Sequence, residues 1–202
     1  LVGPGRDRYS YYPGGEREYW QRYVRRVLQR VSSDERAAEA ADALHTAFSD
    51  PAAWEVFPEV AGTLSALRER GLRLGVISNW DSRLRGLLSD LGLADQFDSI
   101  TVSCEVGVEK PHRAIFEHAL ESLGVEPHDA LHVGDDPVCD FEGPRAAGME
   151  AAVVFREGRI AAGARAVPAP DDSVPRLRSL EAVLGLLKDR ARADRTAKGD
   201  QP

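Results

Sequence analysis

Cysteine and long apolar runs are scarce in this sequence of 202 residues, and each scarcity excludes a class of protein. Its two cysteines, Cys104 and Cys139, are far apart and form no Cys-x-x-Cys pair, which argues against a disulfide framework or a structural zinc site and fits a reducing compartment. No stretch approaches the roughly 20 apolar residues that a membrane span needs, and none has the pattern of a secretory leader. We therefore expect a cytoplasmic protein without a membrane partner.

Positive charge is also in short supply. Lysine and arginine number 26 against 33 aspartates and glutamates, which gives a formal net charge of -7. A net-negative surface does not attract nucleic acid, so we expect no nucleic-acid partner. The arginines of residues 23–30 lie on the polar side of an apolar stripe, which is typical of a solvated helix face.

The five histidines lack a metal-ligand spacing such as His-Glu-x-x-His. We interpret His132 as a core residue and the other four as surface residues. A contact between His112 and a substrate is the alternative, because His112 is close to Lys110 in the sequence.

The first part of the chain has helical periodicity. Apolar and aromatic residues recur at three-to-four spacing over residues 19–31, and Ser33 with Asp34 gives an N-cap signal for a second helix. The sequence thus predicts a helical hairpin over residues 16–48, followed by a proline-flanked linker over residues 50–60. The aromatic stripe packs either on the rest of the protein or on a second subunit, so the sequence leaves the oligomeric state open.

From Pro58 onward, strands alternate with helices. We expect helices over residues 58–70, 82–91, 111–123, 139–147 and 176–187, and strands over residues 72–78, 98–103, 130–135 and 150–155. Apolar strands that alternate with helices are typical of a parallel sheet covered on both faces, so the predicted fold class is α/β. The last residues, 188–202, are too polar to fold on their own.

Polar residues follow the ends of these strands, where parallel sheets bind their ligands. They are Ser78, Asn79, Trp80, Asp81, Lys110, Asp135, Asp136 and, a little further on, Asp140. Hydroxyl and amide groups at a helix start bind phosphate oxygens, and a lysine adds a positive charge for the same anion. Paired aspartates offer Mg²⁺ hard oxygen ligands, and the cation offsets the repulsion between the carboxylates. We therefore expect a phosphate and Mg²⁺ site at the edge where the strands end.

Three segments resemble motifs two, three and four of the haloacid dehalogenase-like (HAD) hydrolase superfamily, subfamily I. They are VISNWDSRL, EVGVEKPHRAIFEHAL and HVGDDPVCDFEGPRAAGM. The closest likeness is to the branch of haloacid dehalogenase-like hydrolase domain-containing proteins. The resemblance implies a Rossmann-like parallel-sheet core over residues 57–188 and a partial helical cap over residues 1–56. The polar composition of residues 189–202 predicts a disordered tail.

The resemblance also implies a function, a Mg²⁺-dependent phosphatase of a small phosphorylated metabolite. It assigns phosphate binding to Ser78 with Asn79 beside it, charge stabilisation to Lys110, a position facing the cap and leaving group to Trp80, and metal binding to Asp135 supported by Asp136 and Asp140. Dehalogenation is the less favoured chemistry, because it does not use the metal that this acidic cluster suits. The substrate itself is not specified, since cap residues set it in capped hydrolases.

One family motif is absent from the sequence. Members of the family begin the core with a strand that ends in Asp-x-Asp-x-Thr, and the first aspartate of this motif is the nucleophile. Asp7 does not fit the position of that nucleophile, because no apolar run precedes it. The family places that strand between the strands that end at Ser78 and Asp135. Because unpaired strand edges are costly, we expect Leu1 to be an interior residue of a longer protein, and this chain alone to be inactive. The alternative is a non-catalytic HAD-like protein that binds phosphate or a protein partner.

Overall fold

The computed structural model describes residues 6–156 and 174–188. The chain forms two compact units, each built from two separate stretches of sequence. The first unit contains residues 1–56 and 75–126, and the second contains residues 57–74 and 127–202. The predicted division into a cap over residues 1–56 and a core over residues 57–188 stays a prediction.

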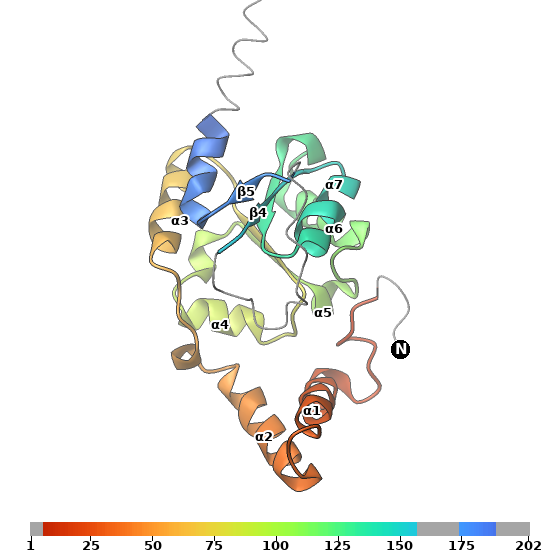
Figure 1. The fold of residues 1–202 in the computed structure, drawn as a ribbon. Helices are drawn as coiled ribbons and strands as arrows, with labels where there is room; N and C mark the ends of the chain where they lie inside the picture. Colours follow the sequence, from red (N-terminus) through yellow and green to blue (C-terminus); the bar gives the residue numbers. More distant parts are fainter. Residues whose placement is uncertain (1–5, 157–173, 189–202) are drawn as a thin grey trace, which may run out of the picture. The chain divides into compact units, whose positions relative to one another are not determined.

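The first unit begins with the predicted helical hairpin, drawn in red and orange in Figure 1. Helix α1 (Gly15–Leu28) packs along α2 (Asp34–Ala47), and the small buried residues Ala37 and Ala41 let the two helices approach closely. Ser33 takes the extended N-cap conformation at the start of α2, although its side chain makes no capping bond. The linker contains one short helix, η1 (Pro51–Ala53), which the side chain of Asp50 caps.

The rest of the first unit is a parallel pair of strands with helices. Strand β1 (Gly75–Ser78) pairs with β2 (Ser99–Val102), so that Ser78 lies opposite Val102. The helical segments are α4 (Leu84–Asp90), η2 (Ala94–Gln96), α5 (Ser103–Val106) and α6 (Arg113–Leu123). Helix α6 packs on both strands and buries residues at helical spacing, which are Ile115, Phe116, Ala119 and Leu120.

Phe116 is expected to carry a large part of the stability of this unit. Its side chain is fully buried under the β1–β2 pair, so Phe116→Ala removes a ring and leaves a cavity. We expect a loss of about 3–5 kcal/mol in the free energy of unfolding, measured by urea titration. Tyr23→Ala on α1 is the control, because Tyr23 is 57% exposed and its truncation should cost under about 1 kcal/mol. Equal losses in both variants would contradict this packing.

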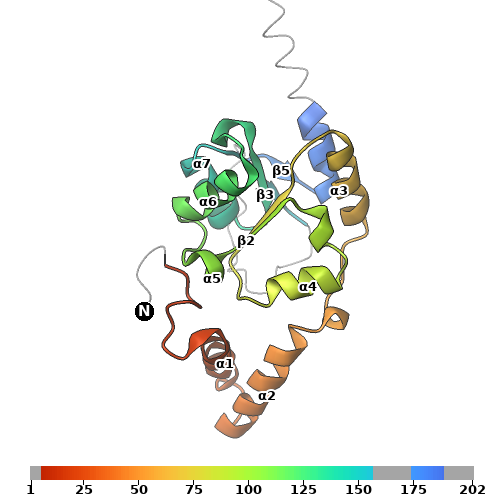
Figure 2. The same cartoon turned by 180° about the vertical axis from the view of Figure 1, so that it is seen from behind.

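The second unit contains three parallel strands. Strand β4 (Glu150–Val154) lies between β3 (Leu131–Gly134) and β5 (Arg176–Leu177). Its helical segments are α3 (Glu59–Glu69), η3 (Pro127–Asp129), η4 (Pro137–Glu142, a π-helix), α7 (Gly143–Ala146) and η5 (Leu180–Ala182), which continues as a helix over residues 183–188. Figures 1 and 2 show this last helix beside α3, where Arg70 donates to the carbonyl of Leu184 at 3.1 Å. The core of the unit is formed by Leu67, Ala152, Leu177 and Val183.

Strands β1 and β3 each have one open edge within the described ranges. The first pairs only with β2 and the second only with β4. Interior strands of a parallel sheet are normally buried on both faces, and β4 meets that expectation at Ala151, Ala152 and Val153. None of the residues of β1 is fully buried. The two strands therefore have the pairing of edge strands but the apolar sequence of central ones.

The predicted fold class, α/β with parallel sheets, is confirmed, and two element predictions need correction. The helix predicted from residue 176 begins later, because residues 176–177 instead pair with β4. The N–H groups of Val153 in β4 and of Phe155, directly after it, donate to the carbonyls of Pro175 and Leu177. The single helix predicted over residues 139–147 is a π-helical turn followed by a short α-helix. The predicted tail, 189–202, lies outside the described residues. In the described part of the chain, no helix is long and apolar enough to span a bilayer.

Candidate phosphate and metal site

The carboxyl end of β1 presents Ser78 and Asn79, which the motif places one after the other. Within the described ranges, the Ser78 hydroxyl makes no hydrogen bond, and its side chain is only half-buried. Asn79 is fixed to Lys110, since its Nδ2 donates to the Lys110 carbonyl at 2.9 Å and its Oδ1 accepts from the Lys110 N–H at 2.7 Å. The structure thus brings Asn79 and Lys110 together, as the sequence predicts, and keeps the Ser78 hydroxyl available for a ligand.

Trp80 is held at its backbone by Ser103, a residue that the sequence interpretation missed. The fully buried Ser103 hydroxyl accepts from the Trp80 N–H at 3.1 Å and donates to the Trp80 carbonyl at 3.2 Å. The indole of Trp80 lies 5.4 Å from Trp54 and 6.5 Å from Phe48, measured between ring centroids. Trp80 therefore faces the aromatic residues of the hairpin and linker.

The three aspartates after β3 lie in different environments. Asp135 is exposed, whereas Oδ1 of Asp136 accepts from the N–H groups of Val138 and Cys139 at 2.8 Å and caps the π-helical turn. Asp140 is buried, and its Oδ2 accepts from the N–H groups of Asp135 and Asp136 at 3.1 and 3.0 Å. Asp140 thus holds the backbone of the segment that carries the exposed Asp135.

Two neighbours fix the buried carboxylate of Asp140. Its Oδ1 lies 2.9 Å from Nε2 of His132, which is itself buried, so the prediction of a core histidine is confirmed. At Gly134, a Cβ would come within 2.2 Å of Cγ of Asp140, so only glycine fits beneath this side chain. Residues 134–136 therefore form a tight turn around Asp140 and also bring carboxylates close together in the sequence.

Removing the Asp140 carboxylate should destabilise the second unit strongly. Asp140→Ala leaves two backbone N–H groups and the His132 ring without their acceptor. We expect a loss of about 3–5 kcal/mol in unfolding free energy, measured by urea titration. Asp129→Ala, at an exposed aspartate of the same unit, should cost under about 1 kcal/mol. A loss no greater than that of the control would show that the buried pair does not support the fold.

The family model described as haloacid dehalogenase-like hydrolase matches residues 3–148, which is most of the chain. This chain belongs to the haloacid dehalogenase-like hydrolase family. It is 40% identical to the human haloacid dehalogenase-like hydrolase domain-containing protein 3 over 174 residues, covering 85% of this chain and 66% of the relative. The chain thus spans slightly less than two thirds of that protein.

Two further HAD relatives are named as phosphatases. A phosphoserine phosphatase of Thermus thermophilus is 36% identical over 155 residues, covering 76% of this chain and 60% of the relative. The crystal structure of a HAD phosphatase from Thermococcus onnurineus aligns with a TM-score of 0.65 and 27% identity, covering 86% of this chain and 81% of that one. The family membership and the Rossmann-like fold predicted from the three motifs are confirmed.

Two other groups of this HAD protein, the Asp7 carboxyl and the Cys104 thiol, lack the properties of a nucleophile. Asp7 is fully buried, and its Oδ2 accepts from the N–H groups of Tyr9 and Ser10 at 2.9 and 2.7 Å and from the Ser10 hydroxyl at 2.9 Å. Burial, followed by a hydrogen bond with Glu16, raises the pKa of the Cys104 thiol and keeps it protonated near neutral pH. Asp7 thus stabilises the turn that follows it by accepting from the N–H groups of Tyr9 and Ser10.

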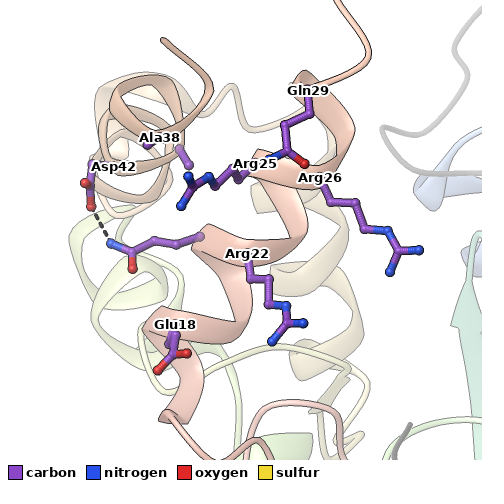
Figure 3. A pocket seen from close by; sticks show the side chains of 9 residues that line it. Glu18, Arg22, Arg25, Arg26, Gln29, Ala38 and Asp42 are labelled. Atoms are coloured by element: carbon purple, nitrogen blue, oxygen red, sulfur yellow. Dashed lines mark hydrogen bonds between the residues drawn. The ribbon is translucent and has the colours of Figure 1, made fainter. Parts of the chain in front are cut away.

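A hollow of about 570 Å³ lies between the two helices of the hairpin, with arginines of α1 along its rim (Figure 3). Two of its charged lining residues, Asp42 and Arg25, are paired within the hairpin, since Arg17 and Gln21 donate to Asp42, and Arg25 donates to Asp34. Opposite charges on both helices thus offset one another. The hollow resembles a solvated helix interface more than a ligand site.

The segment after β3 fits part of a magnesium site. Mg²⁺ keeps several waters and needs only one or two protein carboxylates besides a phosphate oxygen, and Asp135 offers one exposed carboxylate at a strand end. Within residues 6–156 and 174–188, no group of three or more His, Cys, Asp or Glu side chains is arranged to hold a metal. The metal-ligand roles predicted for Asp135, Asp136 and Asp140 stay predictions.

Proposed function

We propose that the protein of which this chain forms part is a Mg²⁺-dependent phosphatase that acts on a phosphate ester of a small metabolite. The observation that carries the proposal is the arrangement at the end of β1, where the Ser78 hydroxyl has no hydrogen-bond partner among the described residues and Asn79 fixes the backbone of Lys110. A free hydroxyl and a held lysine suit a phosphoryl group, because they donate hydrogen bonds and positive charge to it. The relatives named as phosphatases support the same reaction.

The residues of the first unit take separate roles in this proposal. The Ser78 hydroxyl donates to a phosphoryl oxygen, and the Lys110 ammonium stabilises the negative charge that builds up during transfer. Asn79 uses both side-chain groups on the Lys110 backbone, so we assign it a positioning role. Trp80 packs on the aromatic residues Phe48 and Trp54, and we assign it a position facing the cap and the leaving group of the substrate.

In the second unit, the proposed metal ligand is Asp135. Asp136 and Asp140 support it through the capping and backbone bonds that they make, and the buried His132 holds Asp140. When bound, Mg²⁺ supplies positive charge that neutralises the phosphate oxygens. The chain's own contribution is to hold the Asp135 carboxylate exposed at the end of β3.

We further propose that a strand outside this chain carries the nucleophilic aspartate, so the chain alone is inactive. The open edges of β1 and β3 support this proposal, since each is apolar and pairs on one side only among the described residues. A strand inserted there would satisfy the unpaired backbone groups, each of which costs about 1–3 kcal/mol when buried. The helical hairpin would then be part of a cap.

We also propose a cytoplasmic location, which fits the free thiols of both cysteines.

The second candidate is a non-catalytic HAD-like binding protein. It is favoured by one observation, the absence from the sequence of an Asp-x-Asp-x-Thr motif. Such a protein would keep the Ser78 and Lys110 pocket as a phosphate-binding site without turnover.

The two candidates differ in turnover. The intact protein, purified from its own cells, is assayed for release of inorganic phosphate from sugar phosphates, nucleoside monophosphates and phosphoserine. We expect release from at least one ester in Mg²⁺, loss of release in EDTA and recovery when Mg²⁺ is restored. Binding of the esters without any release would overturn the phosphatase proposal and support the binding protein.

A further inference from the structure

The segment that follows the end of β1 contacts the helical hairpin through several consecutive residues. Ser82 donates its N–H and its hydroxyl to the same oxygen of Glu16, in the first turn of α1, at 3.1 and 2.6 Å. Trp80 packs against Phe48, which directly follows α2, and against Trp54 in the linker. Ser78 lies two residues before Trp80, so this contact with the hairpin is close to the end of β1 in the sequence.

Asp81 and Arg83 form the buried centre of this contact. Asp81 is 1% exposed, and Arg83 donates to both of its oxygens, from Nε to Oδ1 at 2.9 Å and from Nη2 to Oδ2 at 2.6 Å. A buried carboxylate in such a place is stable only when it is paired, and the planar guanidinium satisfies both oxygens at once.

The rest of the Arg83 guanidinium faces the hairpin. Its Nη1 donates to the carbonyl of His45 and to the hydroxyl of Ser49, where the last turn of α2 leaves carbonyl groups with partial negative charge. The guanidinium carbon also lies 5.7 Å from the centroid of the Trp20 ring on α1. Burial, and after it the charge of Arg83, lowers the pKa of His45, so that His45 adds little positive charge beside the guanidinium.

We propose that Asp81 and Arg83 form a latch that fastens the α1–α2 hairpin to the segment after β1, and that Arg83 is a positioning residue for Trp80 and Ser78. One side chain holds the buried Asp81, the end of α2 and the face of Trp20. A lysine cannot replace it, because a single ammonium group lacks the planar fork that reaches all three. The contact between the hairpin and the segment after β1 does not depend on any reaction. Only the positioning role of Arg83 in catalysis rests on the proposed function.

The latch is tested by hydrogen exchange on the intact protein without substrate. In Arg83→Lys, we expect the amides of α1 and α2 to exchange about 10-fold faster, with those of β2 and α6 unchanged. Arg85→Lys is the matched control, because Arg85 lies two residues after Arg83, in the first turn of α4, but donates to Glu105 and to the Ile100 carbonyl. It should leave exchange in the hairpin unchanged.

A milder variant keeps the test decisive if Arg83→Lys does not fold. Glu16→Gln weakens the bonds to Ser82 on a partly exposed side chain, and should raise exchange in the hairpin by a smaller factor of about 3. Unchanged exchange in the hairpin, or an equal rise in β2 and α6, would overturn the latch. Given a substrate, Arg83→Lys should raise KM more than it lowers kcat, and equal effects on both would overturn the positioning role alone.

Discussion

Asp135→Asn is expected to lower the Mg²⁺-dependent kcat/KM of the intact protein about 100- to 1,000-fold. Asp135 is the one aspartate of the segment after β3 that is exposed, whereas Asp136 and Asp140 accept hydrogen bonds from backbone N–H groups. The amide has nearly the same shape as the carboxylate but carries no charge, so the variant removes the negative charge of the proposed metal ligand with little change in packing. Initial rates of phosphate release over a range of Mg²⁺ concentrations measure the effect.

Asp129→Asn is the control for this experiment. It makes the same chemical change at an exposed aspartate in the same unit, and should retain the wild-type rate. If Asp135→Asn also kept the wild-type rate and Mg²⁺ requirement, the metal assignment would be wrong and the segment would be only a turn built around Asp140.

Lys110→Met should reduce kcat about 1,000-fold, which corresponds to roughly 4 kcal/mol of lost transition-state stabilisation. The methionine keeps much of the apolar stem and removes the ammonium charge. Because Asn79 holds Lys110 through its backbone, the Asn79 bonds survive the substitution and the loss reports on the charge. Steady-state rates of phosphate release at saturating ester and Mg²⁺ give kcat directly.

Lys188→Met provides the comparison, since Lys188 is exposed at the end of the last described helix. Its kcat should equal that of the wild-type protein. A Lys110→Met variant that raised KM and kept kcat would assign Lys110 to ground-state binding of the ester and would remove its proposed role in charge stabilisation.

Most of the fold could be predicted from the sequence because the strands and helices differ in their apolar period. The strands β1 to β4 lie within the predicted segments, and the hairpin of α1 and α2 matches its predicted bounds to within one residue. The start of β5 could not be predicted, since its two residues are fixed by backbone bonds to β4 that leave no periodic pattern. Such short edge strands are defined by their partner.

The residues proposed to contact phosphate or metal could be identified from the sequence more readily than the residues that support them. Ser78, Lys110 and Asp135 could be identified because each belongs to a motif at the end of a strand or the start of a helix. The Ser103 bonds to Trp80 and the pairing of His132 with Asp140 are contacts between residues of separate motifs or elements. Only a burial pattern, such as a polar residue within an apolar run, hints at them in the sequence.

The proposed phosphatase activity requires a nucleophilic aspartate on a strand outside this chain. Intact mass and N-terminal sequencing of the protein from its own cells test this claim most directly. We predict a preceding segment of a few dozen residues that contains an apolar strand ending in Asp-x-Asp. A mature protein that begins at Leu1 would contradict the account, and the chain would then be a binding protein rather than a phosphatase.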